Sequence, residues 1–292
     1  MRGYALRSAA PVAGLATAVI VIGAGCAGLG AAVAGAGAAV IGVLIAAALT
    51  AAASAYCDRM ALSAMLARPV SEVEHPELYR LVRELSKAGR LPVPRLYLSP
   101  AEQPNSFAVG RGPRTAAVCC TEGLLRILDE AELRGVLGRE LAQVSGRDIL
   151  ASSVSAGLAT IVTFPAAAAR LLPGRGGTSR SGPGVIEGLL LLVFGPIAAL
   201  VVRLAVTRAR EYRADAAGAL LAGDPVALSS ALRKIDFRAA QLPLPADSRL
   251  LPVGHLMIVS PFRAGGIARL FLTYPPTGER VRRLETLAGY RR

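Results

Sequence analysis

The sequence has no tryptophan and few aromatic or charged residues. Only 4% of its 292 residues are aromatic and 18% are charged, although 53% are hydrophobic. A soluble domain of ordinary composition carries about 25% charged residues. This composition excludes a disordered or fibrous chain and points to a membrane protein with room for about two domains. The 31 glycines and the many alanines indicate that its membrane part is built from small side chains.

Lysine is also scarce, because only Lys87 and Lys234 contribute to the 33 basic residues. The arginines are scattered, zinc-finger and RNP-like patterns are missing, and aromatic residues for base stacking are few. We therefore expect no nucleic-acid partner despite the net charge of +13. In a membrane protein, arginine beside the spans is typical of cytoplasmic segments.

The four cysteines include no C-x-x-C pair, which excludes a cysteine-type structural zinc site. Cys26 and Cys57 lie in or at the end of an apolar run, and the adjacent Cys119 and Cys120 suit a buried strand. This usage favours a reducing compartment.

Four apolar stretches predict four transmembrane helices. Residues 8–57 carry no charge and are long enough for two helices joined by a glycine-rich turn at 23–30. A cleaved signal peptide is the alternative for this stretch, although the run is long for one. A second transmembrane pair is predicted within 149–206, interrupted by a loop at 172–184.

Four spans leave two cytosolic segments, 58–148 and 207–292, on the same side as both termini. The excess of arginine in these segments predicts a multi-pass protein of the cell membrane, with the soluble domain and both termini cytoplasmic. Arg170, Arg175 and Arg180, in or beside the opposite loop, run against this bias.

The two soluble segments predict helices around a small antiparallel sheet. Helical spacing is found at 74–87, and short strand-like runs follow at 95–99, 106–110 and 115–120. Asp129 and Glu132 form a D-x-x-E capping box that opens a helix to Gly146. A long helix is predicted to continue from the fourth span to Gly223, followed by a helix capped by Asp224 and a final short helix near the C-terminus.

Several motifs in order resemble a known family: P-N-S-F-A-V-G, E-L-R-G-V-L-G-R-E-L-A-Q-V-S-G, R-E-Y-R-A-D and T-Y-P-P-T-G-E-R. They resemble the HtpX branch of membrane-embedded zinc metallopeptidases, relatives of the CAAX prenyl endopeptidase, over nearly the whole chain. The resemblance implies an α-helical membrane protein with an α+β zincin-like domain.

The zinc signature of that family is altered here. In H-E-x-x-H, two histidines one helical turn apart hold zinc while the glutamate activates the metal-bound water. The corresponding residues are Arg139, Glu140 and Gln143, so both histidines are replaced. Arg139 has no lone pair to donate, and Gln143 offers only a neutral amide oxygen. We therefore predict no cofactor, with Glu140 idle in its general-base position.

The resemblance also assigns residues outside this signature. Glu211 takes the place of the third zinc ligand, Asp215 that of its orienting partner, and Tyr274 stands where the family has a histidine. The alternative for Glu211 and Asp215 is surface pairing with Arg208. A relocated zinc site built on His255 lacks a second histidine on one helical face, and His75 suits a helix start.

Two further expectations concern contacts of the site. Without zinc, buried carboxylates need another partner, and we expect Arg139 to bridge to Glu211 or Asp215 rather than face solvent or headgroups. Asn105 and Phe107 mark the strand whose edge would hold an extended peptide by strand addition, with a structural turn as the alternative.

The sequence therefore predicts a catalytically silent HtpX-like homologue that binds membrane or unfolded polypeptide segments. The alternative is a working zinc metalloendopeptidase of membrane protein quality control, which would contain zinc. A third possibility is a structural membrane subunit with no peptide groove. In each case the lipid bilayer is a partner.

Overall fold

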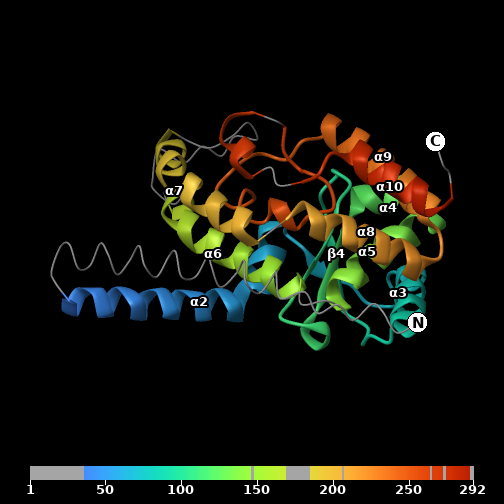
Figure 1. The fold of residues 1–292 in the computed structure, drawn as a ribbon, viewed down its shortest axis with the longest axis horizontal. Helices are drawn as coiled ribbons and strands as arrows, with labels where there is room; N and C mark the ends of the chain where they lie inside the picture. The colour runs from blue at the N-terminus through green and yellow to red at the C-terminus, as the bar shows by residue number, and fades with distance from the viewer. Residues whose placement is uncertain are drawn as a thin grey trace.

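A computed structural model describes residues 36–145, 148–168, 185–205, 207–263, 265–271 and 274–289 (Figure 1). The described chain is mostly helical with one small sheet. Its helices are α2 (Ala36–Ala64), α3 (Pro76–Gly89), α4 (Glu122–Ile127), α5 (Glu130–Ser145), α6 (Asp148–Ala168), α7 (Val185–Ala205), α8 (Arg208–Ala222), α9 (Pro225–Gln241) and α10 (Thr277–Leu287). Its strands are β1 (Arg68–Pro69), β2 (Arg95–Ser99), β3 (Ser106–Val109) and β4 (Ala117–Thr121), and short 3-10 helices are η1 (Pro113–Thr115), η3 (Gly254–Leu256) and η4 (Gly266–Phe271).

The sheet is mixed, so the prediction of an antiparallel sheet was wrong. Its strand order is β1-β2-β4-β3, with β2 parallel to β4 and the other two pairs antiparallel. After β2 the chain crosses to the far side of β4 to form β3, which leaves β2 and β4 side by side in the same direction. Alternating apolar residues mark strands without showing which strands pair.

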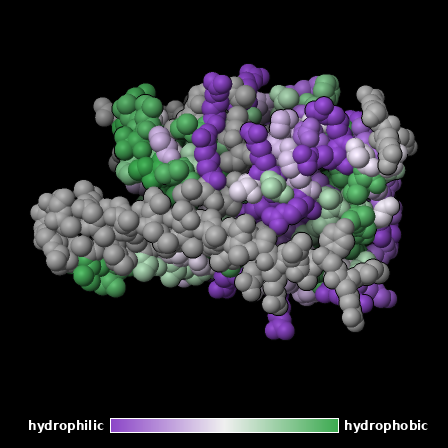
Figure 2. Space-filling model, in the orientation of Figure 1, coloured by the Kyte–Doolittle hydropathy of each residue, from purple (hydrophilic) through white to green (hydrophobic). Residues whose placement is uncertain are grey.

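Among the described residues, two helices are long and apolar enough to cross a membrane, within Ile149–Ala168 of α6 and Val185–Arg203 of α7. They correspond to the third and fourth predicted spans. α2 covers the described part of the second span, and the first span lies outside the described residues. α6 packs against both α2 and α7. Hydrophobic side chains are exposed over this end of the molecule (Figure 2), including Val40 and Leu44 of α2 and Leu189 and Leu192 of α7.

The helix predicted to continue unbroken to Gly223 is two helices. α7 ends at Ala205, and Thr207 precedes α8 in extended conformation, with φ −120° and ψ 147°. The break lets α8 pack against α5 instead of extending the apolar helix. α8 ends as predicted at Gly223, whose φ of +84° favours glycine.

α5 is the central helix of the soluble part. Its predicted capping box is present, since Asp129 Oδ1 accepts from the Glu132 amide at 2.9 Å and Glu132 Oε2 accepts from the Asp129 amide at 3.1 Å. Side chains of α5 pack with α3, α9 and one face of the sheet in a single hydrophobic core. The buried α5 therefore fixes the residues that replace the zinc signature.

Candidate functional site

Two glycines bring α5 and α8 unusually close at the altered zinc signature. A Cβ at Gly218 would lie 2.3 Å from Cα of Arg139, and a Cβ at Gly138 would lie 2.7 Å from the Gly218 carbonyl oxygen. Any larger residue would push the two helices apart. The acidic side chains of α8 therefore lie within contact distance of the Arg139 guanidinium.

Arg139 bridges the two helices, as predicted from the sequence. Its side chain is fully buried and Nη1 donates to Glu140 Oε1 at 2.8 Å. Nη2 donates to the Glu211 carboxylate, and Nε lies 3.4 Å from Asp215 Oδ1. Glu211 and Asp215 are buried, which excludes surface pairing with Arg208 as their environment. One guanidinium thus contacts the carboxyl groups of three residues.

Arg280 of α10 is a second buried cation, which the sequence analysis missed. Its Nε and Nη2 each donate to Asp215 at 2.7 Å, and Nη1 donates to the Ile258 carbonyl oxygen at 2.6 Å. The available signal was helical spacing, because Arg280 lies four residues before the buried Leu284. Arg280 therefore links α10, α8 and the segment around Ile258.

The charges of this buried cluster (Arg139, Arg280, Glu140, Glu211 and Asp215) cancel if Glu140 is neutral. Burial raises the pKa of Glu140, against the opposing effects of Arg139 and of the Ser106 hydroxyl, which donates to Oε1 at 2.8 Å. Glu140 Oε2 has no hydrogen-bond partner in the described chain. Burial lowers the pKa of Arg139, but its carboxylate neighbours outweigh burial and raise it overall. Two arginines then face two carboxylates, Glu211 and Asp215.

Tyr274 also faces this cluster. Its hydroxyl donates to the Gly254 carbonyl oxygen, and its pKa is raised mainly by burial and then by the charge of Glu211. Gln143 is half-buried and takes part in none of the cluster's hydrogen bonds. The structure thus brings together all the predicted site residues of α5, α8 and the C-terminal part except Gln143.

The residues present do not fit a zinc ion. No group of three or more His, Cys, Asp or Glu side chains in the described ranges could hold a metal. A guanidinium lies among the carboxylates, and its fixed charge would repel a dication. His255 does not compensate, because it contacts α6, with Nε2 3.1 Å from Ser155 Oγ. Burial lowers the pKa of His255 to about 4.

The edge of β3 is largely covered by the chain itself. Asn105 and Phe107 are buried, and the Asn105 amide contacts the segment 258–259, with Nδ2 donating to Val259 O and Oδ1 accepting from Ile258 N, both at 3.0 Å. The Ile258 amide also donates to Ser106 O at 2.9 Å. Alternation along the antiparallel pair turns the backbone of Ala108 to the same edge. Ala108 is also buried, at 3% exposure, so an added strand would reach this edge only if the covering elements moved.

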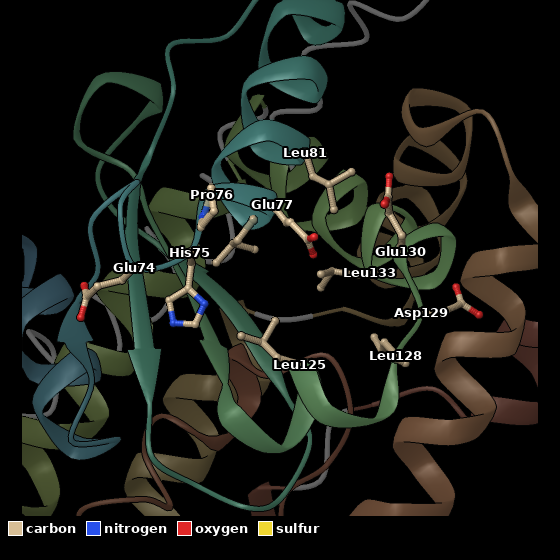
Figure 3. A pocket seen from close by; sticks show the side chains of 11 residues that line it. Glu74, His75, Pro76, Glu77, Leu81, Leu125, Leu128, Asp129, Glu130 and Leu133 are labelled. Carbon is tan, nitrogen blue, oxygen red and sulfur yellow. The ribbon is translucent and has the colours of Figure 1, made fainter.

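A separate hollow of about 350 Å³ lies between the N-terminal ends of α3 and α5 (Figure 3). Leu125, Leu128 and Leu133 line it together with carboxylates and His75. Glu74 pairs with Arg68 at 2.8 Å and Glu130 pairs with Arg80 at 2.7 Å. Acidic residues in first helical turns stabilise the helix dipole, so this hollow needs no ligand to explain its charge.

Comparisons with known proteins agree on one family. A model described as Peptidase family M48 matches residues 72–288, which include α5, α8 and α10. A protease HtpX homolog from Kineococcus radiotolerans is 55% identical over 238 residues, or 80% of each chain. One from Paenarthrobacter aurescens is 49% identical over 246 residues, or 84% of each chain. One from Bifidobacterium longum is 45% identical over 237 residues, covering 80% of this chain and 78% of that relative.

Proposed function

This chain belongs to peptidase family M48, and we propose that within the family it is catalytically silent and binds membrane or unfolded polypeptide segments. The observation that carries the proposal is the position of Arg139 among Glu140, Glu211 and Asp215. A metallopeptidase of the H-E-x-x-H type needs a metal to acidify the attacking water. Glu140, buried beside a guanidinium, has no such water to deprotonate.

The proposed binding surface is the outer edge of β3. Strand addition needs an accessible N–H and C=O on a sheet edge, and those of Ala108 turn to this edge but belong to a buried residue. Because Ser106 O already accepts from Ile258 and Ala108 is buried, an extended peptide would pair with β3 after the segment around Ile258 moves away.

The cell membrane is the proposed location. α6 and α7 would cross it with α2 and the first predicted span, and the arginine-rich soluble part would face the cytoplasm. Segments of membrane proteins leaving the bilayer would then reach the edge of β3.

A working zinc endopeptidase is the second candidate. The names of the relatives and an identity of 55% favour it, as does the retention of Glu140 and Glu211. The two candidates differ in whether the purified chain holds zinc.

Metal analysis and casein cleavage on the full chain in detergent test the proposal. We expect no stoichiometric zinc and no cleavage that a chelator stops. Arg139→His with Gln143→His restores both histidines beside Glu211 and is expected to increase zinc content, whereas Arg139→His alone is the matched control with one histidine. About one zinc per wild-type chain, lost together with cleavage in Glu211→Gln, would establish the second candidate.

Peptide binding is tested separately at the edge of β3. Ala108→Pro removes an outward N–H without touching the β3–β4 pairing. We expect it to abolish binding of a fluorescent unfolded polypeptide; because Ala108 is buried, binding is compared at a temperature below the measured thermal midpoint of the variant. Unchanged binding would favour a structural subunit without a peptide groove.

A further inference from the structure

The turn between β3 and β4 is a fixed, arginine-bearing loop, which we call the hairpin tip (residues 111–115). Gly110 leads into it with φ +148°, and a Cβ there would lie 2.9 Å from Cα of Ala116. Only glycine fits this turn. Thr115 Oγ1 accepts from the Arg111 amide at 3.2 Å, which closes the loop. The path of its backbone, and so the points from which its arginines extend, are therefore set by the sheet.

Two connections, one direct and one through Arg95, place the hairpin tip beside the apolar helices. The Gly110 amide donates to Ser153 Oγ at 3.0 Å, and Ser153 lies near the start of the apolar segment of α6. Arg95 donates to Thr115 O at 3.2 Å and to Asp58 Oδ2 at 2.9 Å, where Asp58 ends the uncharged run of α2.

The last residues of that run are typical of a membrane interface. Tyr56 is exposed on α2, and the guanidinium of Arg59 lies 5.9 Å from its ring. Tyrosine and arginine are enriched where helices leave the hydrocarbon layer. The hairpin tip thus lies at the level where α2 and α6 would leave the bilayer.

Two cations on the hairpin tip have no counter-ion in the described residues. Arg111 and Arg114 are exposed, and neither side chain forms an ion pair or hydrogen bond there. Exposed arginines elsewhere on the same domain pair with carboxylates, as Arg80 and Arg83 do. The two free arginines line a shallow hollow of about 650 Å³ together with Pro92 and Pro113.

We propose that the hairpin tip binds the headgroup of an anionic phospholipid. The inference rests on the proposed membrane location. A phosphodiester accepts hydrogen bonds from guanidinium groups in a bidentate manner, and the two prolines offer an apolar surface to the glycerol and the first methylenes. Zwitterionic lipids present the same phosphate, but their ammonium group is repelled by the two arginines.

Native mass spectrometry of the full chain in detergent tests the site. Dimyristoyl phosphatidylglycerol is titrated against phosphatidylcholine with the same acyl chains, and inorganic phosphate is a third probe. Arg111→Gln with Arg114→Gln should weaken phosphatidylglycerol binding by roughly 30-fold, since one arginine near an anionic surface contributes roughly fivefold. Arg126→Gln with Arg282→Gln removes the same charge from exposed positions on α4 and α10 and should leave binding unchanged.

Each contrary result overturns the proposal. Equal losses in the two double variants would show an effect of total charge, and equal binding of the two lipids would show no headgroup selection. Displacement of the lipid by dilute inorganic phosphate would assign the hollow to a soluble anion. Extraction of the wild type into buffer without detergent, measured first, would refute the membrane location. Zinc binding or cleavage would refute only the proposed catalytic silence.

Discussion

At position 139 a single guanidinium contacts carboxylates on two helices. Glu140 lies on the same helix as Arg139, and Glu211 and Asp215 lie on α8, so the contacts tie α5 to α8. Arg280 of α10 pairs with Asp215 as well, so α10 is also joined to α8. Removing one partner of such a cluster leaves a buried charge uncompensated, which costs more than the pair contributes. The stability of the soluble part should therefore depend on Arg139.

Arg139→Ala should lower the free energy of unfolding by roughly 3–5 kcal/mol. Arg126→Ala, which removes an exposed i,i+4 pair with Glu122, should change it by about 0.5 kcal/mol or less. Thermal unfolding read by a thiol-reactive dye measures both, because Cys119 and Cys120 are buried until the sheet opens. Arg134, one helical turn or so before Arg139, is unsuitable as a surface control because it is half-buried and donates to Glu84 at 2.6 Å. Equal midpoints for the two variants would contradict a structural role for the bridge.

Glu140→Gln should be tolerated at neutral pH. A carboxyl group with a raised pKa holds its proton more tightly in the folded state, so stability falls as pH rises from the ordinary glutamate value through the raised one. Glutamine keeps an oxygen for Ser106 and Arg139 and has no proton to lose. The variant should match the wild type at pH 4 and exceed its stability at pH 8 in urea unfolding.

A charged Glu140 would give the opposite result. Glu140→Gln would then weaken its bond to Arg139, and the variant would be less stable than the wild type at pH 8. Glu279→Gln, at a half-buried position on α10 away from this cluster, is the control for loss of one carboxylate.

Helices were predictable because their signals are local. Apolar residues three and four apart mark the buried face of α3, and Asp224 caps α9 through the amides of Val226 and Ala227. The bridge from Arg139 followed from chemistry, since buried carboxylates without a metal need a cation. These inferences use neighbours in sequence or the properties of one side chain.

Long-range contacts were not predictable from the same residues. The parallel pairing of β2 with β4 depends on the path of residues 100–105, and the break before α8 depends on its packing against α5. Arg280 stands among three arginines of one helix, and only the fold shows which of them is buried. The cover over the edge of β3 comes from residues about 150 positions away.

The helices joined by Arg139, α5 and α8, also determine where the apolar helices α6 and α7 meet the soluble part. α5 ends at Ser145 and α6 begins at Asp148, while α7 ends at Ala205 and α8 begins at Arg208. The connections are two residues long, so both apolar helices enter the soluble part at the same end. The bridge from Arg139 therefore holds the inner ends of α6 and α7 at a set separation.

This arrangement predicts a topology that thiol labelling can test. Since α6 and α7 both join the soluble part directly, we predict that residues 172–184 lie across the membrane from it. Cys26→Ala removes one native thiol, and the three described cysteines are buried. In that background a membrane-impermeant maleimide should label Thr178→Cys in intact cells. Glu72→Cys and Arg282→Cys, at exposed positions, should react only after the cells are permeabilised if the arginine-rich part faces the cytoplasm as proposed. Labelling of Glu72→Cys in intact cells would place the soluble part outside and reverse the orientation.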